Sequence, residues 1–117
     1  MSDRDLYSGL IRLHILYHAS KEAIFGAEIA QELSRHGYSV SAGTLYPMLH
    51  GLERKGYLRS SVERNGRQAR RMYRATPKGR KALKAAKTKV QELFGELFEA
   101  LTTVAVPGAN TSLSNLT

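Results

Sequence analysis

The chain has 117 residues, 18 Lys and Arg against 10 Asp and Glu, a formal net charge of +8, and no Cys or Trp. This length suits one domain, since domains commonly run about 100 to 150 residues, and we expect no second, catalytic domain. Without Cys there are no disulfides, thiolate metal sites or Cys nucleophiles, as is typical of proteins in a reducing compartment.

The charge is distributed unevenly along the chain. Between Arg54 and Lys89 lie 14 of the 18 basic residues and one acid, a net of +13, which leaves 4 basic and 9 acidic residues, a net of −5, elsewhere. Ordinary domains intersperse both signs, so the block predicts a surface that binds a polyanion. Its arginines suit bidentate phosphate contacts, whereas a solvated helix face explains four later lysines equally well: Lys81, Lys84, Lys87 and Lys89.

A first helix is predicted from Asp3 or Asp5, either of which can cap it, to about Ala19. Arg12 and His14 interrupt its apolar stretch, which is far shorter than the roughly 20 residues of a membrane span. The chain start also lacks the basic-then-apolar order of a signal peptide, so we expect a cytoplasmic protein. The apolar positions form an arc wide enough for two packing neighbours: Leu6, Leu10, Leu13 and Tyr17 on one stripe, with Ile11, Ile15 and Leu16 beside it.

Two shorter helices follow. The second is predicted over 26–36, with Gly37 ending it. Ser41 can cap a third over 42–55, and Gly56 ends that one. The third helix turns one apolar stripe toward the core, consisting of Leu45, Met48, Leu49 and Leu52.

The pattern then changes from helical to extended. Strands are predicted over 57–63 and 70–75, with a turn over 64–68 that contains the Asn-Gly pair favoured in hairpins. Thr76 can cap a last helix, with Pro77 at its first position, that runs to about Leu101. Residues 102–117 carry no charge and many Ser, Thr and Asn, and we predict a disordered tail.

This order of elements predicts a mainly α fold with a two-stranded β-wing, a winged helix-turn-helix followed by a long C-terminal helix. The segment SAGTLYPMLHGLERKGYL, residues 41–58, resembles the recognition-helix segment of the PadR family of bacterial transcriptional regulators. RRMYRATPKG, residues 70–79, is similar to that family's wing return and helix entry. With FGAEI at 25–29 and IRLHIL at 11–16, the resemblance covers about residues 6 to 100.

The start of the third helix is the first candidate site. A regular helix from Ala42 would lose the backbone hydrogen bond from position 47 to Gly43, at an interior cost of about 3 kcal/mol. We therefore predict a distorted or 3₁₀ first turn, with Pro47 close to a helix start. Free N–H groups and the positive end of the dipole would then favour phosphate, and the predicted DNA-contacting residues here are Ser41, Thr44, Tyr46, Pro47 and His50. A core role for Tyr46 is the alternative.

The wing is the second candidate site. A hairpin tip can reach an adjacent minor groove or its phosphates. The residues predicted to contact DNA from the wing are Arg64, Asn65, Arg67 and Arg70.

Dimerisation is expected to depend on the last helix and the first. About 25 residues follow Pro77 before the tail, which resembles the short class of the family, where these two helices form the dimer. The seam of the last helix has 3,4 spacing and is too apolar to stand in water alone. The predicted interface is Leu6, Leu10, Leu13, Val90, Leu93, Phe94, Leu97, Phe98 and Leu101.

Chemistry of other kinds is not expected. His14 and His18, four apart on one helix, could clasp a metal, but the one carboxylate at matching spacing, Glu22, lies beyond the predicted helix break. We favour a core or interface role for them and expect no metal or cofactor. No phosphate loop, nucleophile elbow or catalytic carboxylate pair is found in the sequence, so we expect no enzyme.

These observations predict a homodimeric, sequence-specific DNA-binding regulator, a repressor at a pseudo-palindromic operator. The resemblance also implies release by a small effector, frequently aromatic, for which Tyr7, Tyr17, Phe94 and Phe98 are candidate contacts, with plain core packing the favoured alternative. Two alternative functions are a winged-helix module for protein or structured RNA, and a nonspecific DNA-binding protein.

Overall fold

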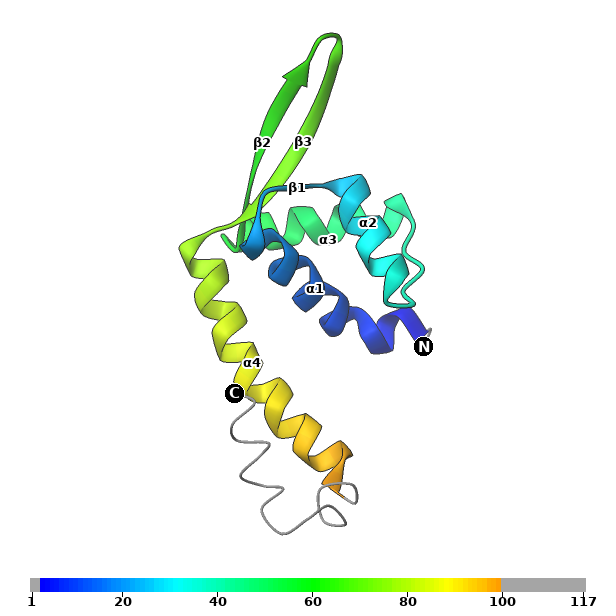
Figure 1. Ribbon diagram of the computed structural model, residues 1–117, viewed down its shortest axis with the longest axis vertical. Coiled ribbons are helices and arrows are strands. Elements are labelled where there is room, and N and C mark those ends of the chain that lie inside the picture. Colours follow the sequence, from blue (N-terminus) through cyan, green and yellow to red (C-terminus); the bar gives the residue numbers. More distant parts are fainter. Residues whose placement is uncertain (1–2, 100–117) are drawn as a thin grey trace. The chain divides into compact units, whose positions relative to one another are not determined.

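The computed structural model describes residues 3–99, except for the side chain at position 4. Within these residues, four helices and three strands follow one another (Figure 1). They are α1 (Asp3–Lys21), β1 (Ile24–Phe25), α2 (Gly26–Arg35), α3 (Ala42–Arg54), β2 (Leu58–Asn65), β3 (Gln68–Ala75) and α4 (Pro77–Leu97). The predicted mainly α winged helix-turn-helix is confirmed, with one additional strand.

The helix bounds agree with the sequence expectation to within a few residues, but the prediction for Pro47 was wrong. α3 is a continuous α-helix from Ala42 with Pro47 inside it. The Leu45 N–H donates to the Ser41 carbonyl at 2.8 Å, so the helical pattern is established before the proline. Pro47 has no N–H, so only the one hydrogen bond to the Gly43 carbonyl is forfeited.

The strands form an antiparallel sheet in the order β1-β3-β2. β1 is the strand that the sequence did not predict. It pairs Ile24 with Tyr73 and Phe25 with Met72, and so joins the connection after α1 to the wing. A two-residue strand carries no periodicity of its own, since period-2 alternation needs about four residues to be recognised.

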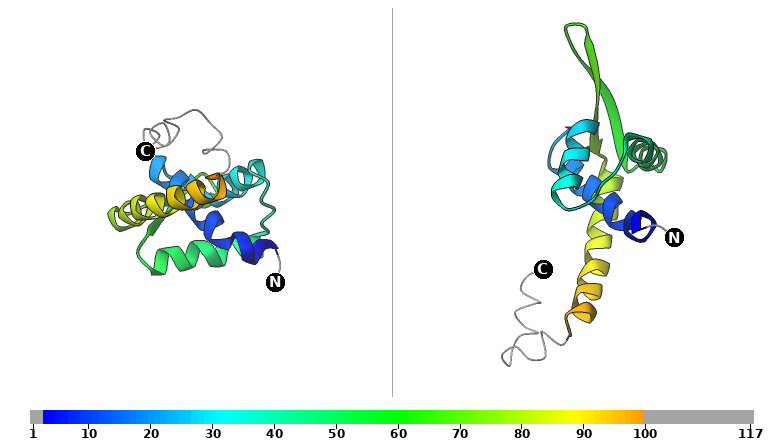
Figure 2. Two further views of the ribbon diagram at one scale, coloured as in Figure 1. Left: turned by 90° about the horizontal axis from the view of Figure 1, so that it is seen from below. Right: turned by 90° about the vertical axis from the view of Figure 1, so that its right-hand side faces the viewer.

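β2 and β3 form a hairpin that projects away from α1, α2 and α3, as Figure 1 and the right-hand view of Figure 2 show. Asn65 pairs with Gln68, which leaves Gly66 and Arg67 as a two-residue loop. Gly66 has a φ of 67° at the first loop position, as a type II′ turn requires. The turn is thus tighter than predicted and both strands are longer.

The core lies where α1, α2, α3 and the base of the hairpin meet. The predicted inward stripe of α3 is confirmed, since Leu45, Met48, Leu49 and Leu52 are all buried. They pack with buried residues of the other elements: Ile11, Ile15, Leu16, Ala19, Ile24, Ile29, Leu33, Leu58, Tyr73 and Ala75. On α1 this leaves the stripe that begins at Leu6 outside the core.

The chain divides into two compact units, the first ending at Leu83 and the second beginning at Lys84. The winged helix-turn-helix and the first turns of α4 belong to the first, and the rest of α4 to the second. No helix among residues 3–99 is long and apolar enough to cross a membrane. The predicted tail and Leu101 lie outside the described residues.

Candidate nucleic-acid interface

One face of α3 is exposed along its whole length. At 100° per residue, Gly43, Pro47, His50 and Arg54 fall within about one sixth of a turn, with Tyr46 at their side. All five are exposed, and the buried stripe lies opposite. The structure therefore brings three predicted residues, Tyr46, Pro47 and His50, onto one outward surface with the predicted Ser41 at its start, and it adds Arg54 at its end.

The residue predicted to cap α3 has the backbone conformation of an N-cap but does not form the capping hydrogen bond. Ser41 is the extended N-cap residue, yet its hydroxyl does not cap a helix N–H. It lies 3.4 Å from the Thr44 hydroxyl instead. Both hydroxyls therefore stand at the positive end of the helix dipole, where they could join the backbone in contacting an anion.

Tyr46 is neither a core residue nor fully free. It is 39% exposed, and its ring lies against Gly26, where a Cβ would be 2.8 Å from the Tyr46 oxygen. The His50 ring is 6.4 Å away on the next turn. The start of α2 therefore holds the Tyr46 ring at the rim of the outward face.

The wing presents unpaired positive charge. Every residue from Ser61 to Arg71 is exposed, including Arg64, Asn65 and Arg67. The ion pairs found within residues 3–99 are those of Glu32, so no wing arginine forms one there. Arginines without a carboxylate partner keep their donors available for phosphate or base edges.

Two arginines of β3 are held by the protein itself. The Arg70 guanidinium stacks 3.7 Å from the centroid of the Phe25 ring, a cation–π arrangement that orients the side chain. Arg71 donates to the Ser60 hydroxyl at 2.9 Å. The predicted DNA contact Arg70 is therefore fastened to β1, with the edge of its guanidinium as the part left for a ligand.

Glu53 fastens α3 to the wing. Its Oε2 accepts hydrogen bonds from the Ser60 hydroxyl at 2.7 Å and the Ser60 N–H at 3.1 Å. The hydroxyl bond is the main cause that lowers the pKa of Glu53, opposed by burial and aided by the Ser60 N–H and by Arg71 and His50. The carboxylate thus links the end of α3 to the first residues of β2.

Sequence reasoning missed two contributions to this surface, those of Glu53 and Arg54. Arg54 was counted in the basic block without a role, although its distance of seven residues from Pro47 places both on one helix face. Glu53 acts through Ser60, a pair seven residues apart across a helix end. No pattern in the sequence signals that pair.

Most of the apolar residues predicted for the dimer interface are exposed in each unit, as far as the described residues reach. In the first, Leu6 is 64% exposed and Leu10 is also exposed, while Leu13 is half-buried. In the second, Leu97 is 68% exposed, and Val90, Leu93, Phe94 and Phe98 are exposed too. Apolar faces of this kind mark interaction sites in soluble proteins.

The family model of the PadR-like transcriptional regulators matches residues 15–85, which is more than half of the chain. The chain belongs to the PadR-like family. Among its relatives, a transcriptional regulator of Mycobacterium tuberculosis is 50% identical over 94 residues, which cover 80% of this chain and 88% of that protein.

Solved PadR-family structures share this fold. A regulator from Eggerthella lenta matches with a TM-score of 0.73 and 28% identity over 83% of this chain and 86% of that one. A PadR-like regulator from Bacillus cereus matches with a TM-score of 0.75 and 25% identity, over 83% of this chain and 96% of that one. Bacillus subtilis PadR, solved in complex with operator DNA, matches with a TM-score of 0.59 and 21% identity, over 65% of this chain and 46% of that one. This is a similarity of fold.

Proposed function

We propose that this PadR-like regulator is a cytoplasmic, homodimeric repressor that binds a pseudo-palindromic operator. The observation that carries the proposal is the joining of two basic, outward surfaces, α3 and the wing, through Glu53 and Ser60. A helix and a hairpin linked in this way suit a helix in the major groove with a hairpin alongside it. The operator DNA bound by the Bacillus subtilis relative is consistent with it.

The roles on this surface follow from its chemistry. Ser41 and Thr44 would meet phosphate at the start of α3, and Tyr46, Pro47 and His50 would face the groove. Arg64, Asn65 and Arg67 would reach the neighbouring minor groove or its phosphates. Arg54 would contact backbone phosphate at the other end of α3.

A second copy would cover the exposed apolar faces of α1 and α4. Covering them removes large apolar side chains from water, which favours association at about 25 cal/mol per Å². A two-fold dimer imposes its symmetry on the site, so half-sites should lie about one helical turn apart, roughly 34 to 36 Å. Small aromatic molecules that enter this interface would be the effectors.

A footprint on the DNA upstream of the protein's own coding region tests the proposal. We expect protection of one pseudo-palindrome, with affinity falling about 10³- to 10⁵-fold between 50 and 200 mM salt if 6 to 10 phosphates are neutralised. Arg67→Ala and Tyr46→Phe should each weaken it, whereas Lys21→Ala, an exposed cation outside the basic block, should not. A weak salt dependence on the specific site would contradict the assignment.

The same variants separate the alternative functions. Protection of all DNA would indicate a nonspecific DNA-binding protein. Unchanged DNA binding by Arg67→Ala and Tyr46→Phe, together with loss of a protein or RNA partner, would indicate an interaction module. A thermal-shift screen with phenolic acids and cationic drugs tests the effector, and the absence of any shift would leave the aromatic residues as packing residues.

A further inference from the structure

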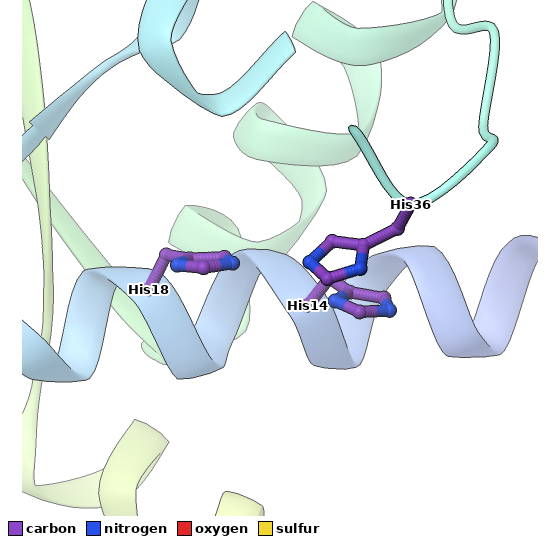
Figure 3. Close-up of side chains that lie close together, drawn as sticks. All are labelled: His14, His18 and His36. Atoms are coloured by element: carbon purple, nitrogen blue, oxygen red, sulfur yellow. The ribbon is translucent and has the colours of Figure 1, made fainter. Parts of the chain in front are cut away.

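Three of the four histidines of the chain meet at one place. His14 and His18 lie one turn apart on α1, and His36 comes from the C-cap of α2, over His14 (Figure 3). One nitrogen from each of the three rings lies within 4.8 Å of the others. The ring centroids of His14 and His36 are 4.6 Å apart.

The carboxylate of Glu32 adds a fourth potential metal ligand beside them. Glu32 and His36 are four apart, as are His14 and His18, so two i, i+4 pairs face each other from neighbouring segments. Glu32 Oε2 is 3.9 Å from His18 Nε2. That is too long for a hydrogen bond, and the buried His18 Nε2 has no hydrogen-bond partner among the described residues.

The cluster has the chemistry of a ligand set, since it offers three imidazole rings and a carboxylate at one place. A neutral imidazole keeps a lone pair for a metal ion. Imidazole and carboxylate donors suit Zn²⁺, Co²⁺ or Ni²⁺ rather than Ca²⁺ or Mg²⁺, which take oxygen ligands.

We propose that His14, His18 and His36, with Glu32 beside them, bind a divalent transition-metal ion of the Zn²⁺ class. Nitrogens around a tetrahedral Zn²⁺ are about 3.3 Å apart, given Zn–N distances of about 2.0 to 2.1 Å. The two ring nitrogens that lie farthest apart must therefore approach each other by roughly 1.5 Å. Rotation about the broad terminal torsion of a His side chain can supply this movement. The exposed His36 is the freest to move.

The site joins α1 to the connection between α2 and α3. His36 is five residues before Ser41, the N-cap of α3. An ion held by His36 and by α1 would restrain this connection, and with it the start of the proposed recognition helix. This step rests on the proposed function, and linkage requires that operator and metal then change each other's affinity by the same factor.

The first experiment uses untagged full-length protein without DNA. A Co²⁺ titration followed by visible absorption, and competition by Zn²⁺, should show one site per chain. His36→Gln should weaken Co²⁺ binding at least about tenfold, the smaller loss seen when an outer partner of a metal site is removed. His50→Gln removes the one histidine outside the cluster and should bind Co²⁺ as the unaltered protein does.

The control variant and a folding check decide whether the cluster is a metal site. Thermal unfolding of His36→Gln should match the unaltered protein without metal, because His36 is exposed. Equal Co²⁺ affinity in His36→Gln, or loss of it in His50→Gln, overturns the site and leaves the cluster as packing. His14→Gln and His18→Gln should also weaken binding, and Glu32→Gln should do so less.

The second experiment measures operator affinity in a chelator and with Zn²⁺. The two affinities should differ in the unaltered protein and coincide in His36→Gln. Equal affinities in the unaltered protein overturn the coupling, while the Co²⁺ titration still decides the site. An operator that binds under neither condition counts against the proposed function and not against the metal site.

Discussion

At Gly79 the chain has no room for a side chain. A Cβ there would lie 2.1 Å from the Tyr57 carbonyl oxygen. This close approach lets Thr76 cap α4, because the Gly79 N–H donates to the Thr76 hydroxyl at 2.9 Å and the Thr76 N–H to the Tyr57 carbonyl at 3.0 Å. The wing and the last helix therefore meet through backbone contacts that only glycine permits.

Gly79→Ala should lower the free energy of unfolding by about 2 to 3 kcal/mol, as overpacking against fixed atoms does. Urea unfolding at pH 7 measures it. Gly9→Ala is the matched control, since a Cβ on that exposed α1 residue meets nothing within 4 Å and should stabilise the helix by up to about 1 kcal/mol. Equal stability of the two variants would show that the Tyr57 backbone shifts to make room for the added Cβ.

Glu53 gives a prediction about pH. Its pKa is lowered in the folded protein, so its contribution to stability is present above the unfolded value of about 4.3 and is lost as pH falls through the lowered pKa. Glu53→Gln should cost up to about 1 kcal/mol at pH 7, the net value of one such hydrogen bond. The difference between the two proteins should shrink as the pH falls below about 4.

Unfolding experiments at several pH values test this, with Glu22→Gln as the control because Glu22 is exposed and lies outside the Ser60 contacts. A difference for Glu53→Gln that is the same at every pH would assign its effect to packing. A difference that grows toward acid pH would contradict the direction of the pKa shift.

At the scale of elements, the wing should govern how affinity depends on salt. Arg64 and Arg67 are exposed without ion-pair partners within residues 3–99, so each can neutralise one phosphate. The proposed dimer carries two copies of each arginine, so Arg64→Ala and Arg67→Ala should each reduce the salt slope of operator binding by about 2. Binding measured at four salt concentrations gives that slope.

Arg70→Ala should behave differently from these two. Its guanidinium is stacked on Phe25, so its loss should also lower stability, by about 0.5 to 1 kcal/mol for a cation–π contact at an exposed site. A change in salt slope without a change in stability would show that phosphate contact is its main role. Unfolding in urea beside the binding assay separates the two.

Helices and hairpin could be predicted because each has a period and an end signal. The buried stripe of α3, from Leu45 to Leu52, repeats at helical spacing, and Gly37 and Gly56 end α2 and α3 with positive φ. What could not be predicted depends on tertiary pairing. β1 exists because Ile24 and Phe25 find β3, and neither residue signals this alone.

The candidate site divides in the same way. The outward face of α3 follows from periodicity, so its residues could be proposed from the sequence. The anchoring of Glu53 to Ser60 and of Arg70 to Phe25 depends on how the helices meet the sheet. The third histidine near His14 was missed for this reason, since His36 is 22 residues further along the chain and on another element.

For the whole molecule, the exposed apolar faces predict the assembly. Leu97 and Leu93 are at least half exposed on α4, and a dimer would bury them. Leu97→Asp would place a charge in that contact, which costs several kcal/mol unless the charge is paired. Sedimentation at micromolar concentration should show a dimer for the unaltered chain and a monomer for Leu97→Asp.

Val62→Asp is the matched control, because Val62 is also a half-exposed apolar residue but lies on the wing. It should remain a dimer. The affinity of the monomeric Leu97→Asp for the operator should fall far more than the loss of any one contact explains. The two half-sites are then no longer bound by one dimer, so the gain in affinity from linked binding, often about 10²- to 10⁴-fold, is lost. A Leu97→Asp monomer that binds the full operator with unchanged affinity would mean that the regulator reads each half-site alone, and the palindrome would then have no structural basis.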